Sequence, residues 1–476
     1  MTITTATTWE TVIGLEVHVE LATATKLFCG CPNVFGDEPN TNVCPVCLGL
    51  PGSLPVLNRQ AVELAMRIGA ALHSEVRPSV FHRKNYFYPD MPKDYQVSQY
   101  DEPINNGGWL DLPGGTRVGI TRAHMEEDTG KTTHIGASGR IHGADHSLVD
   151  YNRSGVPLVE IVSEPDLRSA EASRAYVNEL RAILEAIGAS DARMEEGSMR
   201  VDANVSVRRP GASTFGTRAE IKNLNSVRSL GRAIEYETAR QVALLEAGET
   251  VVQETRHWNE DEGRTSSMRS KEEAYDYRYF PEPDLLALAP DAEWQAQVRS
   301  SLPLLPADRR AALAAVAGCT TDDSAVVTVV AQGLDDLVTA AVGAGIDARL
   351  ALNRAANEVA GRKPPDPTAF VRVLAMESEG LLTATQAKAV LGEVLTGGGD
   401  PDEIARVRGF EALTGDALAT AVDAAIAAHP GEWARFAGGE AKLGGFFVGK
   451  VMAVTAGKAD GKAVTSLLRE RAAGGL

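Results

Sequence analysis

The sequence lacks the long apolar runs that carry a protein into or across a membrane. The N-terminal segment MTITTATTWE has neither a basic start nor an apolar core, so it predicts no signal peptide. No stretch reaches the roughly 20 consecutive apolar residues that a spanning helix needs. Cysteine is scarce, with five in 476 residues. We therefore expect a cytoplasmic protein without membrane contact, in a compartment where thiols stay reduced.

Motifs for a serine nucleophile and for a phosphate-binding loop are also missing. The sequence contains no G-x-S-x-G elbow and no serine-rich glycine loop. GGFFVGKV at 444–451 has Val451 where a phosphate loop needs Ser or Thr, and TGKTT at 129–133 has Met125 in place of the first glycine. If the protein uses ATP, a metal ion and Lys or Arg side chains must hold the phosphates.

A surplus of basic residues is absent as well. The formal net charge is −17, which argues against nucleic-acid binding through a broad basic surface. Residues 411–476 differ from the rest, because their seven basic and seven acidic residues balance. A nucleic-acid contact would have to be local, and we expect it at this C-terminal end.

Four of the five cysteines lie within residues 28–52, as Cys29, Cys31, Cys44 and Cys47. Two close pairs joined by a loop of Gly, Pro and Asn favour a tetrahedral Zn²⁺ site, since the chain must turn back for four thiolates to meet. The first pair is C-x-C instead of the commoner C-x-x-C. Reduced cysteines that bind no metal are the main alternative, and a disulfide knot is a weaker one.

The pattern of the first 295 residues predicts an α+β domain with a large mixed, mainly antiparallel sheet. VIGLEVHVEL at 12–21 alternates apolar and polar residues, as a half-buried strand does. MRVDANVSVRR at 199–209 does the same, and helical periodicity covers 169–187 and 226–247.

From about residue 300 the sequence becomes rich in Ala and Leu and helical in period. The segment TGGGDPD at 396–402 reads as a linker. We therefore expect a mixed domain over 1–295, a helical domain over 296–396 and a small all-helical tail domain over 403–476.

The polar face of the first predicted strand carries Glu16, His18 and Glu20. Two carboxylates and an imidazole at alternate positions can hold a hard divalent cation such as Mg²⁺. A solvent-facing edge strand is the alternative. RAHMEEDTGK at 122–131 and LVDYNRSGVPLVEIVSEPD at 148–166 add further acids and an arginine, which favours a metal beside an anion.

The segment FHRKNYFYPDMPKDYQ at 81–96 places Arg83, Lys84 and Lys93 around three aromatic residues. Cations interleaved with aromatic rings suit a phosphate or a stacked base. A buried aromatic hairpin with lysines on its surface is an equal alternative.

Seven segments together resemble one family. They resemble, in their order and in their residues, the sequence motifs of the B subunit of the aspartyl/glutamyl-tRNA amidotransferases (GatB). The resemblance runs from about residue 9 to the end. The segments are ETVIGLEVHVEL, RKNYFYPDMPKDYQ, ITRAHMEEDTGK, LVDYNRSGVPLVEIVSEPD, MEEGSMRVDANVSVR, IKNLNS and DYRYFPEPDL.

The resemblance implies an ATP-dependent ligase that works within a heterotrimer. The B subunit phosphorylates the side-chain carboxylate of misacylated Glu-tRNA(Gln) or Asp-tRNA(Asn). Ammonia from glutamine, hydrolysed in the GatA subunit and channelled to this site, then forms the amide, while a small GatC subunit wraps the assembly. The mixed domain would be the catalytic cradle, and the tail domain would bind the tRNA.

Carried onto this sequence, the resemblance implies a role for each group of candidate residues. Mg²⁺ ligands fall on Glu16, His18 and Glu127, with Asp150 as a weaker candidate. Contacts to the ATP phosphates fall on Lys84 and Lys93, with Arg153 possible. Zn²⁺ would be structural, because some family members lack the cysteines.

The residues alone leave two other classes of function as alternatives. A zinc-dependent hydrolase could use the cysteine cluster, although four thiolates leave no open position for water. A non-enzymatic RNA-binding scaffold with a zinc ribbon is the other, and the acidic charge speaks against it.

Overall fold

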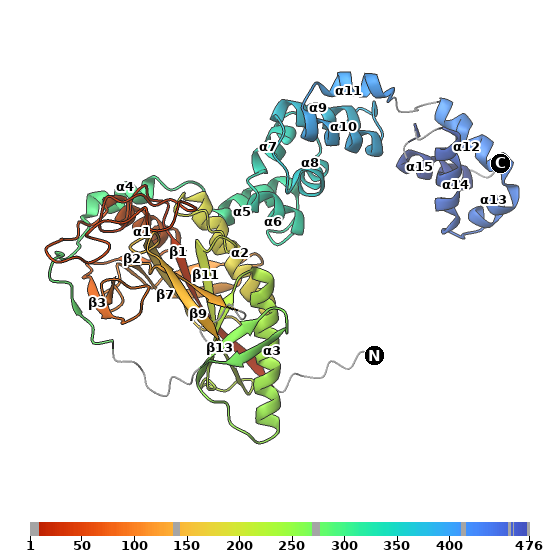
Figure 1. Ribbon diagram of the computed structural model, residues 1–476. Helices are drawn as coiled ribbons and strands as arrows, with labels where there is room; N and C mark the ends of the chain where they lie inside the picture. The colour runs from red at the N-terminus through yellow and green to blue at the C-terminus, as the bar shows by residue number, and fades with distance from the viewer. Residues whose placement is uncertain are drawn as a thin grey trace. The chain divides into compact units, whose positions relative to one another are not determined.

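The computed structural model describes residues 9–136, 143–268, 277–410, 416–455, 458–459 and 461–473. The chain forms two compact units, Met1–Asp308 and Arg309–Leu476 (Figure 1). Each unit is considered by itself below.

A large mixed sheet organises the first unit. Among the described pairings, that of β12 with β13 is parallel and the others are antiparallel. The α+β prediction is therefore confirmed. The main path runs through β14 (Arg264–Ser267), β13 (Glu254–Asn259), β12 (Ala219–Leu224), β11 (Met199–Arg208), β1 (Glu10–Glu20), β10 (Pro157–Ser163), β7 (Arg117–Glu127), β4 (Tyr95–Ser98), β3 (His82–Asn85) and β15 (Phe280–Pro281).

Short strands extend this sheet, and a separate hairpin lies beside the site described below. The short strands β2 (Glu75–Val76), β5 (Asn105–Asn106) and β6 (Trp109–Asp111) pair with one another or with β7. The hairpin consists of β8 (Lys131–Gly136) and β9 (Ala144–Asp150).

The central strand β1 separates an apolar face from a polar one, as its alternation predicts. Ile13, Leu15, Val17 and Val19 are each at most 1% exposed and join the main core. The intervening side chains of β1 stay partly accessible on the opposite face. Because β1 lies between β10 and β11, its polar face is the middle of the sheet and not an exposed edge.

Four helices among the described residues complete the first unit, and each begins at a side chain that caps its free N–H groups. They are α1 (Arg59–Ala71), α2 (Ala170–Ala186), α3 (Val227–Glu246) and α4 (Ala292–Ser300), capped by Asn58, Ser169, Ser226 and Asp291. The helices predicted over 169–187 and 226–247 are confirmed within a residue or two at each end. Their apolar faces pack on the sheet in one core.

The second unit is helical in all of its described regular elements and contains two cores. The first core involves α5 (Pro306–Ala317), α6 (Ser324–Ala331), α7 (Asp335–Gly343), α8 (Ala348–Arg354), the π-helical turn Ala355–Val359, α9 (Pro367–Ser378), α10 (Ala384–Gly397) and α11 (Pro401–Arg408). The second involves α12 (Asp416–Ala428), α13 (Pro430–Ala437), α14 (Leu443–Val454) and α15 (Gly461–Ala473).

Two of the predicted domain boundaries differ from the boundaries that this packing indicates. Val298 of α4 packs into the sheet core, and Ala405 of α11 packs with the first helical core. Within the Gly-rich segment at 396–402, only residues 398–400 lie between α10 and α11, and Gly398 adopts a positive φ of 67° there. We propose that the domains divide near residue 308 and between α11 and α12.

None of the described helices has both the length and the apolar character that crossing a membrane alone requires. Helices α6 and α7 meet these requirements only together, and they bend by 111° at their junction. Val326, Val329 and Val338 of these helices are buried in the helical core.

Candidate active site and metal centres

Three side chains form a line across the middle of the sheet on its polar face. His18 of β1 lies opposite Glu160 of β10, and Glu160 lies opposite His124 of β7. Directly opposed residues on neighbouring strands place their side chains on the same face, about 5 Å apart. The alternation that buries Val17 and Val19 thus gathers His18, Glu160 and His124 on the other face.

Glu126 joins this group because it lies two residues after His124 on the same strand. His18 Nε2 is 3.6 Å from Glu126 Oε1 and 3.5 Å from Glu160 Oε2. One donor atom from each of these three residues lies within 4.8 Å of the others, which is close enough for one cation to bridge them. Two carboxylates and an imidazole suit Mg²⁺ or Mn²⁺.

The charges in this group are balanced by a proton on His18. Burial opposes a charge on this ring, but the hydrogen bond to Glu160 and the charge of Glu126 outweigh it and raise the pKa of His18 to about 9. Burial and the charge of Glu160 raise the pKa of Glu126. Although burial opposes ionisation of Glu160, its bond to His18 and nearby positive charges hold its pKa below the usual range. A divalent cation would take over this balancing role.

His124 is a further donor beside the same carboxylates. Its Nε2 lies 3.6 Å from Glu160 Oε2 and 3.9 Å from Glu126 Oε2, and neither ring nitrogen has a described hydrogen-bond partner. Burial lowers the pKa of His124 to about 4, so the ring is neutral at pH 7. A neutral imidazole with unpaired nitrogens is suited to bind a cation.

Glu127, which the sequence analysis assigned to this metal, lies on the opposite face of β7. Its carboxylate accepts hydrogen bonds from Lys93 Nζ and, at 2.9 Å, from the backbone N–H of Val97. Adjacent residues of a strand point to opposite faces, so Glu126 and Glu127 cannot both join His18. Of the two, Glu126 lies beside His18 and Glu127 lies beside Lys93.

Lys93 therefore forms an ion pair with Glu127 and lies away from the donor group around His18. The pair lines a separate cavity of about 200 Å³ between the cysteine segment and the sheet. Cys47 and Arg83 also line it. The prediction that Lys93 contacts the ATP phosphates does not fit this position.

The donor group around His18 opens into a cavity of about 1170 Å³. His18 and Glu126 are part of its lining. Five cationic side chains share that lining, which are Lys84, Lys131, Arg153, Arg200 and Lys222. A cavity with a cation site and several basic side chains can hold a polyanion.

Lys84 and Arg153, both predicted to face an anion, thus reach the cavity. Lys84 Nζ lies 4.9 Å from the centre of the Tyr277 ring. Arg153 is held in place, because its Nε donates to the backbone oxygen of Thr129 at 3.0 Å and lies 3.2 Å from Asp128 Oδ2. Phe87 and Tyr88 are 75% and 58% exposed, so the alternative of a buried aromatic hairpin does not hold for these two residues.

Three cations of the cavity, Lys131, Arg200 and Lys222, were not singled out from the sequence. Arg200 lies opposite His18 in the β1–β11 register and donates to Asp128 at 2.9 Å. Lys222 of β12 lies 2.6 Å from Asp202 Oδ2 and 2.8 Å from Glu220 Oε1. The alternation of 199–209 puts Arg200 on the polar face, but only the strand pairing shows that this face adjoins β1.

Glu16 and Asp150, the other predicted metal ligands, lie outside the donor group around His18. Glu16 accepts a hydrogen bond from Asn204 Nδ2 at 2.9 Å, and burial together with the charge of Glu160 raises its pKa. Asp150 Oδ1 accepts backbone N–H bonds from Asn40 at 3.0 Å and Asn152 at 2.9 Å. Asp150 lines the cavity, yet its bonds tie the cysteine segment to β9.

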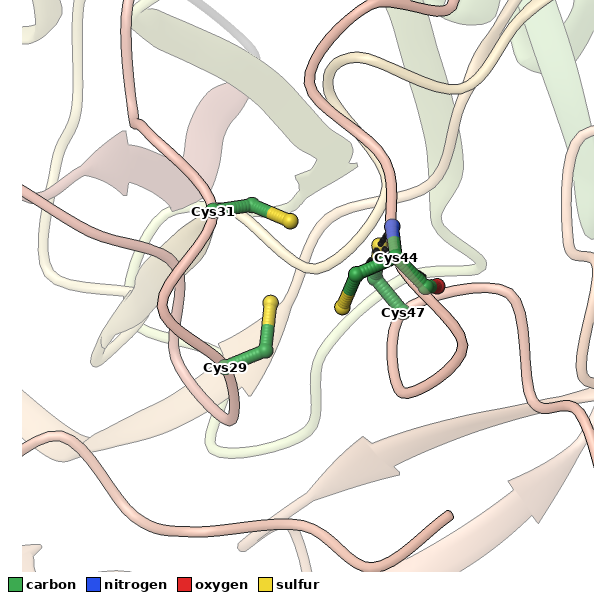
Figure 2. A group of neighbouring side chains, drawn as sticks. All are labelled: Cys29, Cys31, Cys44 and Cys47. Atoms are coloured by element: carbon green, nitrogen blue, oxygen red, sulfur yellow. Dashed lines mark hydrogen bonds between the residues drawn. The ribbon is translucent and has the colours of Figure 1, made fainter.

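The four cysteines form a second group, among the described residues, that could hold a metal ion. Figure 2 shows the four thiols converging from the two pairs. The sulfurs lie within 4.8 Å of one another, and those of Cys44 and Cys47 are 3.9 Å apart. Zn–S bonds of about 2.3 Å require sulfurs about 3.8 Å apart in a tetrahedron. The group therefore fits Zn²⁺.

Cys47 is the thiol that ionises most easily. The hydrogen bond from Cys29, the backbone N–H of Cys44 and the charge of Lys26 outweigh burial and lower the pKa of Cys47 to about 5. Lys26 is itself fully buried beside the group. A thiolate near a buried cation is prepared for metal binding.

Comparison with known proteins assigns the family. The family model described as "GatB/GatE catalytic domain" matches residues 11–296, and that described as "GatB domain" matches residues 336–471. The chain belongs to the GatB family. The first match contains the whole polar face described above as well as the cysteine segment.

Bacterial relatives resemble the chain over almost its full length. A protein of Frankia casuarinae (strain DSM 45818) is 54% identical over 97% of this chain and 95% of its own length. Proteins of Mycobacterium sp. (strain KMS) and Streptomyces coelicolor are 51% and 49% identical, with coverage of 95% or more of both chains. All three are named as the B subunit of an aspartyl/glutamyl-tRNA(Asn/Gln) amidotransferase.

Proposed function

We propose that this chain is the B subunit of an ATP-dependent tRNA amidotransferase. It converts the side-chain carboxylate of Glu-tRNA(Gln), Asp-tRNA(Asn) or both into the amide. The observation that supports this most is the group of His18, Glu126 and Glu160 beside a large cavity whose lining includes five cationic side chains. Such a cavity suits phosphoryl transfer between two anions, which requires positive charge.

The reaction needs ATP because ammonia cannot displace hydroxide from a carboxylate. A carboxylate oxygen of the tRNA-bound amino acid attacks the terminal phosphorus of ATP, and the bond from that phosphorus to the ADP oxygen breaks. The product is an acyl phosphate. Ammonia then attacks its carbonyl carbon, phosphate leaves, and the nitrogen loses a proton to give the amide.

His18, Glu126 and Glu160 would hold a Mg²⁺ ion, which when bound neutralises phosphate charge. His124 lies close enough to these carboxylates to act as a further ligand. Lys84 and Arg153 would contact phosphate oxygens from the cavity wall, and Arg200 and Lys222 are further candidates. Asp128 orients Arg153 and Arg200 through its ion pairs with both.

Ammonia would come from a partner, since the sequence has no nucleophile motif for hydrolysing an amide donor. We propose a glutaminase subunit (GatA) and a small subunit (GatC) as partners in a heterotrimer. The α12–α15 domain would contact the tRNA. Zn²⁺ at the cysteines would be structural, because four thiolates complete its coordination.

The adjacent residues Glu126 and Glu127 provide a matched test. In the reconstituted heterotrimer, Glu126→Gln should lower Mn²⁺ affinity at least tenfold and remove ATP-dependent activation of Glu-tRNA(Gln), while tRNA binding survives. Glu127→Gln should leave Mn²⁺ affinity within about twofold, because its carboxylate faces Lys93. Unchanged Mn²⁺ binding and activation in Glu126→Gln would contradict the proposed site, and a wild-type complex that amidates neither tRNA would contradict the function.

A further inference from the structure

The segment between the two cysteine pairs forms part of the wall of the large cavity. Residues 33–37 line that cavity together with His18, Lys84 and Arg153. Two apolar side chains of the segment stay open, with Val34 55% exposed and Phe35 76% exposed. An aromatic ring this exposed in the lining of the cavity offers a free face for a flat, uncharged group.

Both ends of this segment are fixed by hydrogen bonds, one to the residues that follow β1 and the other to the end of β9. Before Val34, the backbone N–H of Asn33 donates to the oxygen of Ala24 at 3.1 Å, and its side chain donates to the oxygen of Leu21 at 3.1 Å. The flanking cysteines Cys31 and Cys44 meet in the four-thiol group. The position of Phe35 is therefore set by contacts on both sides.

Asn40 forms the second attachment, which we call the Asn40 latch. Its side chain donates to the oxygen of Val149 at 3.1 Å and accepts from the N–H of Tyr151 at 2.8 Å. Its own N–H donates to Asp150 Oδ1 at 3.0 Å. Asn40 adopts a φ of 61°, a left-handed conformation that Asn and Gly tolerate better than other residues.

Asn42 and Lys26 strengthen the same attachment. The N–H of Asn42 donates to Asn152 Oδ1 at 2.8 Å. Lys26 Nζ donates to the oxygens of Asn42 at 2.7 Å and Tyr151 at 3.3 Å. Lys26 therefore joins the segment to the residues that lead into Arg153, which lies on the cavity wall.

We propose that Phe35 stacks on an adenine ring at this cavity, and that the cysteine group and the Asn40 latch act as positioning devices for Phe35. The proposal rests on the proposed function and names a subsite for it. Two substrates of that reaction carry adenine, namely ATP and the 3′-terminal adenosine of the tRNA. Stacking on an aromatic side chain recognises the ring that both share.

The first experiment measures amidation by the reconstituted heterotrimer with Phe35→Ala. Loss of a base–aromatic stack should raise the KM of the substrate whose adenine binds here by about 5- to 150-fold. The turnover number at saturation should stay within about twofold, since a contact remote from the reacting phosphate is equal in ground and transition states. Varying ATP and aminoacyl-tRNA separately identifies which adenine is bound.

Two variants control for structural damage. Phe215→Ala removes an aromatic side chain that is 59% exposed and lies outside the cavity lining, so it should change neither KM. Phe35→Trp keeps an aromatic face and should restore the KM to within about threefold of the wild type.

The latch is tested with Asn40→Gly, which keeps the left-handed backbone and removes only the side-chain bonds. It should retain zinc, speed amide hydrogen exchange over residues 33–42 and raise the same KM that Phe35→Ala raises. The double variant should add little to Phe35→Ala alone, because both changes act through one ring. An active wild-type complex in which Phe35→Ala changes neither KM would overturn the inference and leave the proposed function intact.

Discussion

Two groups of side chains in the same unit could each hold a metal ion, and they differ in almost every property that matters for catalysis. The group around His18 mixes carboxylates with imidazoles and opens into the large cavity. The cysteine group uses four sulfurs from one chain segment and leaves no position for substrate. An open, oxygen-rich group suits phosphoryl transfer, whereas a closed sulfur group suits a structural role.

Their attachment to the fold differs too. His18, Glu160 and His124 stand on three neighbouring strands in the middle of the sheet, so the main core fixes their spacing. The cysteines lie on irregular backbone, which a metal would have to hold together. The sheet therefore positions the group around His18, whereas the cysteine group positions the chain segment that carries it.

The largest expected effect comes from Glu160, which contacts both histidines. Glu160→Gln should reduce ATP-dependent activation of Glu-tRNA(Gln) by at least about 1000-fold, because it removes a charged ligand from the proposed cation site. The measurement is single-turnover formation of ADP in the reconstituted heterotrimer. Equal loss in Glu164→Gln, which follows β10 and accepts a hydrogen bond from Thr121 instead of contacting the histidines, would mean that the effect is not specific to the site.

The next effect separates the two groups by stability. Cys44→Ser with Cys47→Ser should abolish zinc binding and lower the Tm of the first unit by roughly 5 °C or more, since metal binding contributes to folding. Metal content and calorimetry measure both. A Tm equal to that of the wild type would show that the cysteines do not hold the segment.

The two faces of β1 provide a third contrast. Leu15→Ala removes a side chain that is 1% exposed and should cost about 2–5 kcal/mol of unfolding free energy without changing Mn²⁺ affinity. His18→Ala should do the opposite, with weaker Mn²⁺ binding at a smaller cost in stability. Denaturant titration and Mn²⁺ titration of both variants would show whether stability and binding separate by face.

The smallest effect is expected far from both groups. Arg181 and Glu185 form an exposed i,i+4 ion pair on α2 at 2.9 Å. Glu185→Ala should change the unfolding free energy by no more than about 0.5 kcal/mol and leave activity unchanged. A larger change in activity would reveal a surface role for α2 that the present account does not include.

Much of the fold could be predicted from periodicity. The alternation at 12–21 predicted β1 and its polar face, and helical periodicity predicted α2 and α3 to within a residue or two. The end of the first unit was harder to place, because α4 and the residues after it are composed like the helical region yet pack on the sheet core. Composition alone cannot show which core a short helix joins.

The site was predicted in part, and the misses have one physical cause. His18, Lys84, Arg153 and the cysteines lie where their patterns indicated. The resemblance implied Glu127. Three consecutive acids do not show which of them points to the polar face of the strand, and only the pairing with β10 reveals it. Arg200, Lys222 and the placement of Glu160 beside His18 required the order of the strands, and that order is a long-range property.

The most direct test compares the two groups in one measurement, the rate of ADP formation at saturating ATP and Glu-tRNA(Gln) in the reconstituted heterotrimer. The account predicts that Glu160→Gln loses at least about 1000-fold, while Cys44→Ser stays within about threefold because its effect falls on KM. A Cys44→Ser complex as inactive at saturation as Glu160→Gln, or a Glu160→Gln complex that keeps its rate, would contradict it.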